Sequence, residues 1–271
     1  MLWQFVCMPG DQELTMYHPI NRKIVKHLFL PIIFCFCFVS IVAAQDQPEP
    51  ILIQVNQLDI KPDKLEQFRS IHRDVFIPTA RANGVPWRLT STIALGNTLS
   101  TTVVSPIPNM AALDSQGGPA STELEGQLAL NLWAQTVQAR RSFIVTSRPD
   151  MSMAAQPQTG LTVVYRFRVT IGKIPQFVAL WNEKVIPALE TSNITGTRVF
   201  QTVSGGLIGE FYSLTPVANF ATADGPGPFS GLEPQEAQAL NMEMTALLDE
   251  MELTYNRVDQ ELSYGLAGTQ Q

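Results

Sequence analysis

Few side chains in this sequence could carry acid–base or metal chemistry once the first 44 residues are set apart. All three cysteines precede Gln45, and His72 is the one histidine that follows it. Thiol nucleophiles, disulfides and cysteine-based metal sites are therefore excluded beyond Gln45, and a Ser-His-Asp triad would have to use His72. Phosphate-binding loops, dinucleotide fingerprints and paired-carboxylate motifs are absent from the sequence, so we expect neither a metal nor a cofactor.

His72 lies among apolar residues spaced three or four apart, as on one face of a helix. Because the ordinary pKa of imidazole is near neutrality, this side chain could act as a general base or an axial ligand. The residue 109 positions later is Trp181. A position that accepts either His or Trp on an apolar stripe is better explained by packing.

A second group of candidates is aromatic or cationic and could line a pocket. Arg88 and Arg198 begin matching strand-like runs, and an arginine at a cavity mouth could bind a carboxylate. The simpler interpretation is that the arginines are solvated strand residues and the aromatic residues belong to the core. The aromatic candidates are Trp87, Trp133, Tyr165, Trp181, Phe200 and Tyr212.

The elements that must position these residues occur twice. Residues 52–84 align with residues 161–193 without a gap at an offset of 109, with seven identities among 33 pairs. Each copy begins with a β-branched, strand-like run and continues with an amphipathic helix. Pro78 and Pro187 are expected to end or kink that helix.

The rest of each copy predicts a hairpin, a second long helix and a last strand. The hairpin strands are expected at 87–95 with 99–105 and at 198–203 with 207–213, and the last strands at 143–147 and 253–258. The order β-α-β-β-α-β is that of the ferredoxin-like split unit. We therefore predict an α+β protein with repeats at 45–153 and 161–271, joined by a linker at 154–160.

The segment FRVTIGK at 167–173, followed by Phe177 and Pro187, is a strand that runs into a Gly-Lys turn and a Phe-bearing helix. It resembles the dimeric α+β barrel superfamily, which includes antibiotic-biosynthesis-type and haem-degrading monooxygenases. In that superfamily two sheets pack face to face across a dimer. Together with the duplication, the resemblance implies two tandem ferredoxin-like repeats packed as an α+β barrel within one chain.

The resemblance also implies a role for Asn56. Monooxygenase-like members often carry an asparagine on the first strand, seven residues before the turn glycine and directed at the barrel cavity. Asn56 lies seven residues before Asp63, which is the position equivalent to Gly172, and Tyr165 is the counterpart of Asn56 in the second repeat. An amide there could hold a substrate oxygen or an oxyanion, although a structural strand polar residue is the simpler interpretation. Haem-degrading members add a mid-domain Trp and His, whereas residues 108–141 contain Trp133 but no histidine, which argues against haem degradation.

The amino-terminal region predicts export. A basic stretch at 22–27 precedes an apolar run at 28–44 that ends Val-Ala-Ala, as in a signal peptide cleaved near Ala44. The alternative is a membrane anchor formed by residues 28–44, although this run is short for a span. Met16 would be a more ordinary start than Met1. We expect a secreted or periplasmic protein that does not contact the membrane after cleavage.

Composition narrows the function classes further. The 271 residues carry a net charge of −6 and are 45% hydrophobic, which argues against both a disordered chain and a nucleic-acid-binding protein. We expect an accessory protein that binds a small apolar or aromatic ligand. The alternatives are a cofactor-independent monooxygenase of a small aromatic or quinol-like substrate, which needs little beyond positioning and desolvation, and a non-catalytic interaction protein with a filled barrel. A homodimer is compatible with each of these three functions.

Overall fold

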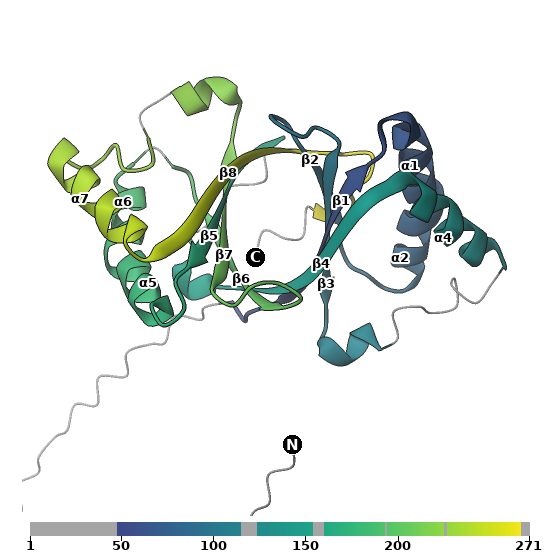
Figure 1. Ribbon diagram of the computed structural model, residues 1–271, viewed down its shortest axis with the longest axis horizontal. Coiled ribbons are helices and arrows are strands. Elements are labelled where there is room, and N and C mark those ends of the chain that lie inside the picture. The colour runs from purple at the N-terminus through teal and green to yellow at the C-terminus, as the bar shows by residue number, and fades with distance from the viewer. Residues whose placement is uncertain (1–47, 115–123, 154–159, 193, 225–226, 267–271) are drawn as a thin grey trace, which may run out of the picture. The chain divides into compact units, whose positions relative to one another are not determined.

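A computed structural model describes residues 48–114, 124–153, 160–192, 194–224 and 227–266 (Figure 1). We call residues 52–153 the first half and residues 160–266 the second half. The first half contains β1 (Leu52–Ile60), α1 (Leu65–Ile71), α2 (Ile77–Ala82), β2 (Leu89–Ile93), β3 (Ser100–Ile107), α4 (Leu124–Thr136) and β4 (Val137–Ser147). The second half contains β5 (Leu161–Val169), α5 (Ile174–Leu180), α6 (Ile186–Glu190), β6 (Arg198–Ser204), β7 (Glu210–Val217), α7 (Pro234–Thr245) and β8 (Leu248–Val258).

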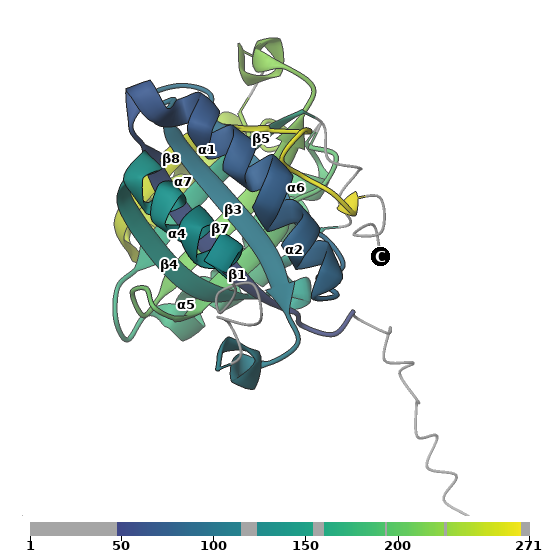
Figure 2. The same cartoon turned by 90° about the vertical axis from the view of Figure 1, so that its right-hand side faces the viewer.

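The eight strands form one closed barrel in the order β1-β3-β2-β8-β5-β7-β6-β4. All neighbouring strands are antiparallel, and the two halves meet where β2 pairs with β8 and where β4 pairs with β6. The helices lie outside the barrel, and α1, α2 and α4 cover the strands of the first half (Figures 1 and 2). Closure leaves the sheet without free edges.

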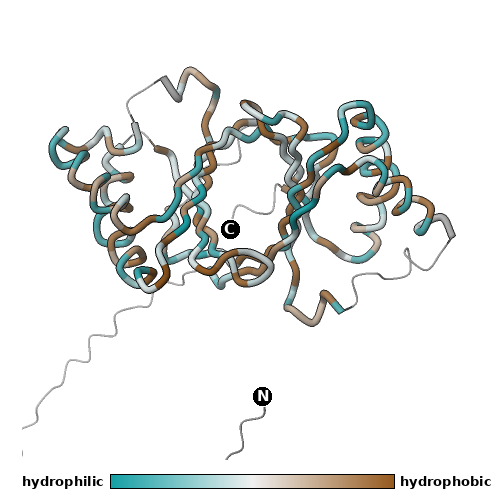
Figure 3. The backbone as a smooth tube through the Cα atoms, in the orientation of Figure 1, coloured by the Kyte–Doolittle hydropathy of each residue, from teal (hydrophilic) through white to brown (hydrophobic). Residues whose placement is uncertain are grey.

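Strand alternation separates two apolar layers in each half. Along β1, Ile53 and Val55 point into the barrel, whereas Leu58 and Ile60 pack against Phe68 of α1. The hydropathy of the strands accordingly changes from residue to residue along the backbone (Figure 3). Each strand therefore serves a helix–sheet interface on one face and the barrel interior on the other.

The first helix of each half does not end at its proline, as the sequence had suggested it could. A π-helical turn, His72–Phe76 or Trp181–Val185, immediately precedes the prolyl segment, and the helix then continues through α2 or α6. The Ile77 N–H donates to the His72 carbonyl, five residues back. Proline has no N–H to donate, and its ring would crowd the preceding turn of a regular α-helix. The wider π-helical turn makes room for this ring.

The hairpin and last strands differ at their ends from the sequence prediction. The first hairpin strand is shorter, at Leu89–Ile93, and β4 and β8 begin at Val137 and Leu248, several residues earlier than predicted. The early part of β4 is polar, yet it pairs with the end of β1, where Asp59 lies opposite Ala139. Strand partners thus extend these elements beyond their apolar residues.

The chain segment after each half's last strand crosses to the opposite half. Met151, after β4, is completely buried in the second half's core, and Leu262, after β8, is buried in the first half's core. Isolated main-chain bridges accompany the crossings, joining Met153 to Thr197 and Tyr264 to Arg88. Each half therefore completes the core of the other.

Among the described residues, no helix is long and apolar enough to cross a membrane. The predicted signal or anchor at 28–44 and most of the predicted linker at 154–160 lie outside the described residues.

Candidate functional site

The barrel encloses a cavity of about 700 Å³. Its wall is largely apolar, because the inward faces of the strands supply mostly aliphatic and aromatic side chains. The apolar part of the lining includes Ile53, Val55, Trp87, Val104, Phe143, Val145, Val164, Phe200 and Leu214. A mostly apolar cavity of this size is typical of small-molecule sites.

Two polar atoms of the cavity wall have no hydrogen-bond partner among the described residues. They are the hydroxyl oxygen of Tyr212 on β7 and Oδ1 of Asn256 on β8. The Tyr212 ring stacks on Phe143 at 5.6 Å between ring centres, which holds the hydroxyl in place. Burial, and then the nearby Glu210 carboxylate, raise the pKa of Tyr212, so its hydroxyl stays a proton donor. Because buried polar groups are nearly always paired, this pattern favours a ligand with its own polar groups.

Charged side chains gather at the barrel end where β5 finishes and β7 begins. Glu210 is only 1% exposed, and its carboxylate lies 2.7 Å from Arg141 Nη2 and 3.2 Å from Arg166 Nη1. Arg166 also pairs with Glu250 at 2.6 Å and Glu252 at 2.9 Å. The charges of these guanidinium and carboxylate groups compensate each other.

The cavity includes some of the predicted site residues and not others. Trp87, Phe200 and Tyr212 line it, as the aromatic-pocket hypothesis proposed. Tyr165 faces the helices instead, where its ring stacks on Phe167 at 5.9 Å. Trp181 is 3% exposed in the second half's core.

The indole N–H of Trp181 is hydrogen-bonded as well as buried. Its N–H donates to the Met151 carbonyl at 2.8 Å, and its ring contacts Phe167 and Phe177. These contacts give Trp181 a packing role and no access to the barrel cavity.

Asn56 does not point into the barrel, which corrects the orientation implied by the resemblance. On β1 the inward residues are Val55 and Gln57, so Asn56 belongs to the opposite face. Its Oδ1 accepts hydrogen bonds from Ser142 Oγ at 2.6 Å and from Arg140 Nη2 at 3.0 Å. The amide is therefore occupied within the first half.

Arg88 and Arg198 are not equivalent, although both stand where a strand begins. In the β-ladders Leu89 pairs with Val104, and Arg198 pairs with Leu214 in the same way. Leu89 is therefore the counterpart of Arg198, and both line the cavity. Because a shift of one residue reverses the sheet face, Arg88 points toward the helices.

His72 lies between Phe68 and Phe76 and is 2% exposed. Its Nδ1 is 2.7 Å from Arg88 Nη2, and its Nε2 faces Trp133 Nε1–H at 3.1 Å. Burial, and then the Arg88 charge, lower the pKa of His72 to about 2. The imidazole is thus neutral at physiological pH and too weak a base for general-base catalysis near neutrality.

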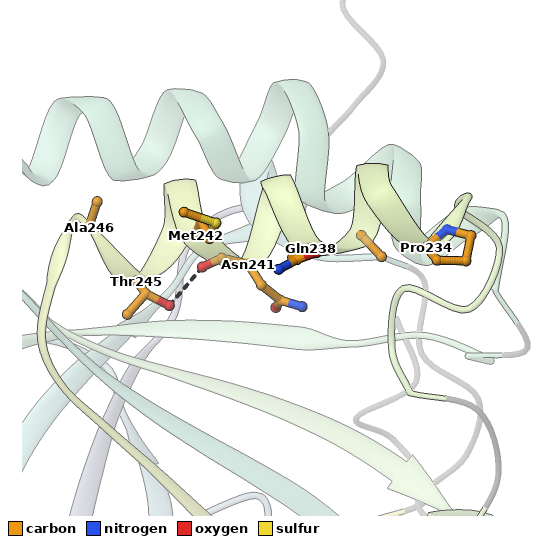
Figure 4. A pocket seen from close by; sticks show the side chains of 7 residues that line it. Pro234, Gln238, Asn241, Met242, Thr245 and Ala246 are labelled. Atoms are coloured by element: carbon orange, nitrogen blue, oxygen red, sulfur yellow. Dashed lines mark hydrogen bonds between the residues drawn. The ribbon is translucent and has the colours of Figure 1, made fainter.

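A groove on the outer face of α7 is a less convincing site (Figure 4). Uncharged residues of one helix line it, and Thr245 Oγ1 donates within that helix to the Asn241 carbonyl at 2.7 Å. A site is expected to bring polar groups together from several elements. Within the described ranges, no group of three or more His, Cys, Asp or Glu side chains could hold a metal ion.

Asn256, Arg166 and Glu210 were not among the residues predicted from the sequence. The alternation of β8 carries a usable signal, because Glu252, Thr254 and Asn256 all line the cavity. Strand parity anchored on Tyr212 would likewise have placed Glu210 on the inward face of β7. Side chains on other strands determine whether each group finds a partner. Glu210 pairs with Arg141 and Arg166, whereas Asn256 Oδ1 has no hydrogen-bond partner among the described residues.

Comparison with known proteins identifies the fold. No family model and no curated sequence matches the chain. Among solved structures, a "putative monooxygenase" from Lactobacillus acidophilus has a TM-score of 0.52 at 10% identity, covering 79% of this chain and 95% of its own. A "putative monooxygenase" from Fusobacterium nucleatum has a TM-score of 0.53 at 10% identity, covering 77% and 92%.

An anthrone oxidase-like protein is similar in the same way, with a TM-score of 0.50 at 12% identity, covering 84% of this chain and 96% of its own. These neighbours and the closed eight-stranded barrel with external helices define an α+β barrel protein. The chain shares its fold with these proteins, and at these identities the likeness shows the fold alone.

Proposed function

We propose that the barrel binds one small, largely apolar molecule whose polar groups reach Tyr212 and Asn256. The observation that carries this proposal is the cavity of about 700 Å³ with two unpaired buried polar atoms in its wall. Asn256 Oδ1 accepts a hydrogen bond from a hydroxyl or N–H of the ligand, and the Tyr212 hydroxyl donates a hydrogen bond to a ligand oxygen. The cavity weighs against a barrel filled by side chains.

The proposal includes two tandem ferredoxin-like repeats, at 45–153 and 161–271, that arose by duplication. The equal element order and the spacing of 109 residues between the two π-helical turns support it. The structural neighbours also match over most of this chain and of their own. Since one chain closes the barrel, a homodimer would not be needed to complete the cavity.

Ligand titration of the purified full chain tests the binding function. We expect 1-naphthol to bind more tightly than naphthalene and to change the fluorescence of Trp87. Tyr212→Phe should weaken 1-naphthol binding about 3- to 10-fold through the loss of one hydrogen bond, with the fold retained by circular dichroism.

Tyr165→Phe is the matched control, because this tyrosine faces the helices. It should leave the affinity for 1-naphthol unchanged. Equal affinities of the wild type and Tyr212→Phe, or equal losses in both variants, would contradict a polar site at Tyr212.

The names of the structural neighbours favour a second function for the same cavity, a cofactor-independent monooxygenase. In such a reaction the doubly activated CH₂ of an anthrone-like substrate is oxidised by O₂. Its two hydrogens and one oxygen atom leave as water, and the other oxygen atom becomes the new carbonyl. Tyr212 would stabilise the enolate oxygen, and the apolar wall would exclude water.

Oxygen uptake with anthrone tests this second function. Turnover above the uncatalysed rate, lost in Tyr212→Phe, would support it. Asn56→Ala tests the site that the resemblance implies. Asn56 lies on the opposite sheet face from the barrel cavity, so this variant tests that site separately from Tyr212. If oxygen uptake stays at the background rate while 1-naphthol binds tightly, only the binding function is supported.

Export completes the proposal. Residues 1–44 direct secretion and are removed near Ala44, so that residues 45–271 act outside the cytoplasm. Amino-terminal sequencing of the chain recovered from an exporting host tests cleavage. Recovery of an uncleaved chain in the membrane fraction would instead indicate an anchor at 28–44.

A further inference from the structure

Three polar side chains meet at the helix–sheet interface of the first half, on the opposite sheet face from the barrel cavity. Arg88 precedes β2, His72 begins the π-helical turn, and Trp133 lies on α4. Arg88 Nη2 and Trp133 Nε1 lie 2.7 Å and 3.1 Å from the two ring nitrogens of His72. Three separate elements thus bring these groups together in an otherwise apolar layer.

Donors outnumber acceptors in this cluster. Guanidinium and indole nitrogens only donate, and a neutral imidazole has one lone pair to accept with. Both ring nitrogens of His72 therefore face donors, although only one of them can accept. Arg88 Nε is also buried and has no partner among the described residues. Among the described residues, the cluster therefore has fewer acceptor atoms than donors.

The cluster also lacks negative charge. Burial lowers the pKa of Arg88 to about 10, which leaves the guanidinium charged at neutral pH. No carboxylate within the described ranges forms an ion pair with Arg88, whereas Glu210 in the same barrel has two arginine partners. A desolvated cation is costly unless an anion compensates it.

The fold itself does not require these groups. In the second half the position of His72 is taken by Trp181, whose N–H is satisfied by Met151. The position of Arg88 in the β-ladder is taken by Thr197, fully buried and 2.8 Å from Ser213 Oγ. The same backbone is thus built without a cation or a donor conflict.

We propose that Arg88 and Trp133 form a second ligand site, which binds an aromatic monocarboxylate against His72. A carboxylate supplies the missing acceptors and charge, and the guanidinium is the side chain best suited to it. The aromatic part of the ligand fits the surroundings, since Phe68 and Phe76 flank His72 at 4.1 Å and 5.0 Å between ring centres. Phe76 in turn contacts Trp133.

Nitrogen NMR of the histidine-labelled full chain with benzoate as the probe tests this site. The His72 resonances are assigned by their loss in His72→Gln, which separates them from those of His18 and His27. Benzoate should shift both His72 ring-nitrogen signals and raise the pKa of the imidazole, because the added negative charge offsets Arg88. Acetate should bind more weakly, and benzyl alcohol should leave the signals unchanged.

Arginine variants decide whether the site depends on Arg88. Arg88→Gln should weaken benzoate binding about 10- to 100-fold. Arg198→Gln is the matched control on the cavity face and should bind benzoate like the wild type, as should Tyr212→Phe. If Arg88→Gln fails to fold, Trp133→Phe retains the ring but removes one donor, and it should weaken benzoate binding several-fold.

Unshifted His72 signals at saturating benzoate would overturn the proposal. So would a benzoate affinity that survives in Arg88→Gln or falls equally in Arg198→Gln. Acetate, inorganic phosphate or benzyl alcohol binding as tightly as benzoate would overturn the assignment to an aromatic carboxylate.

Discussion

The helix–sheet interfaces of the two halves have the same backbone plan and opposite chemistry. In the second half, Phe177 contacts Phe167, Trp181 and Phe211, with ring centres 5.1 to 5.8 Å apart. In the first half, its counterpart Phe68 has one ring contact within the described ranges, with the imidazole of His72. Aromatic packing thus fills one interface, whereas polar groups occupy part of the other.

The difference shows how one barrel can divide stability and chemistry between its two halves. Among the described residues, the core cluster around Phe177 contains thirteen buried residues, and the cluster around Phe68 contains six. Since burial of apolar surface is the dominant favourable contribution to folding, the second half can stabilise the joint barrel. The exchanged chain segments couple this stability to the first half, where the buried polar groups lie.

Truncating the matched phenylalanines gives the largest expected effect on stability. Phe177→Ala should lower the free energy of unfolding by about 4–5 kcal/mol, and Phe68→Ala by about 3 kcal/mol, because the first removes more ring contacts. Urea unfolding of both variants measures the gap. An equal or larger loss in Phe68→Ala would contradict the comparison.

The second half also supplies the buried carboxylate at the barrel end, that of Glu210. Glu210→Gln should lower the free energy of unfolding by about 3 kcal/mol, because it leaves Arg141 and Arg166 without their buried partner. Glu252→Gln is the control: Glu252 also pairs with Arg166 but is 51% exposed. It should change the unfolding free energy by less than about 1 kcal/mol.

Acid should weaken the first half specifically. Folding lowers the pKa of His72 from 6.5 to about 2, so between these values the unfolded chain binds a proton that the folded chain excludes. The stability that this group contributes is complete above pH 6.5 and is lost as the pH falls. From pH 7 to pH 5, wild type should lose about 2 kcal/mol more unfolding free energy than His72→Gln. Parallel urea titrations at the two pH values measure the difference, and equal losses would contradict it.

The two buried indoles give the finest test of the comparison. Trp181→Phe should cost at least about 1 kcal/mol, because the Met151 carbonyl loses its donor. Trp133→Phe should be closer to neutral, because it removes one of the two donors that face His72. Thermal unfolding of both variants compares them, and a larger loss in Trp133→Phe would show that its hydrogen bond is favourable.

Much of the fold was predictable because it depends on local periodicity. The β-branched runs gave β1 and β5, and the three-and-four spacing gave the helices that contain Phe68 and Phe177. The strand ends were less accurate because pairing extends them, as at Val137 in β4. The prolines were compatible with a continued helix because the π-helical turn makes room for their rings.

The candidate sites were predicted only in part. The sequence alone selected Trp87, Tyr212, His72 and Arg88 by residue type, and each lies in or beside a cavity or a buried polar cluster. It did not select the sheet face correctly for Asn56. Tertiary contacts determine that Asn56 bonds to Ser142, that Trp133 meets His72 and that Asn256 Oδ1 has no hydrogen-bond partner among the described residues.

The elements and their order follow from the amino-acid sequence, because hydrophobic spacing and turn residues act over a few positions. Which buried polar groups are paired and which are not depends on the folded arrangement of the strands and helices. Their partners lie on strands and helices far away in the chain, and a shift of one residue along a strand exchanges the barrel interior for the helix layer.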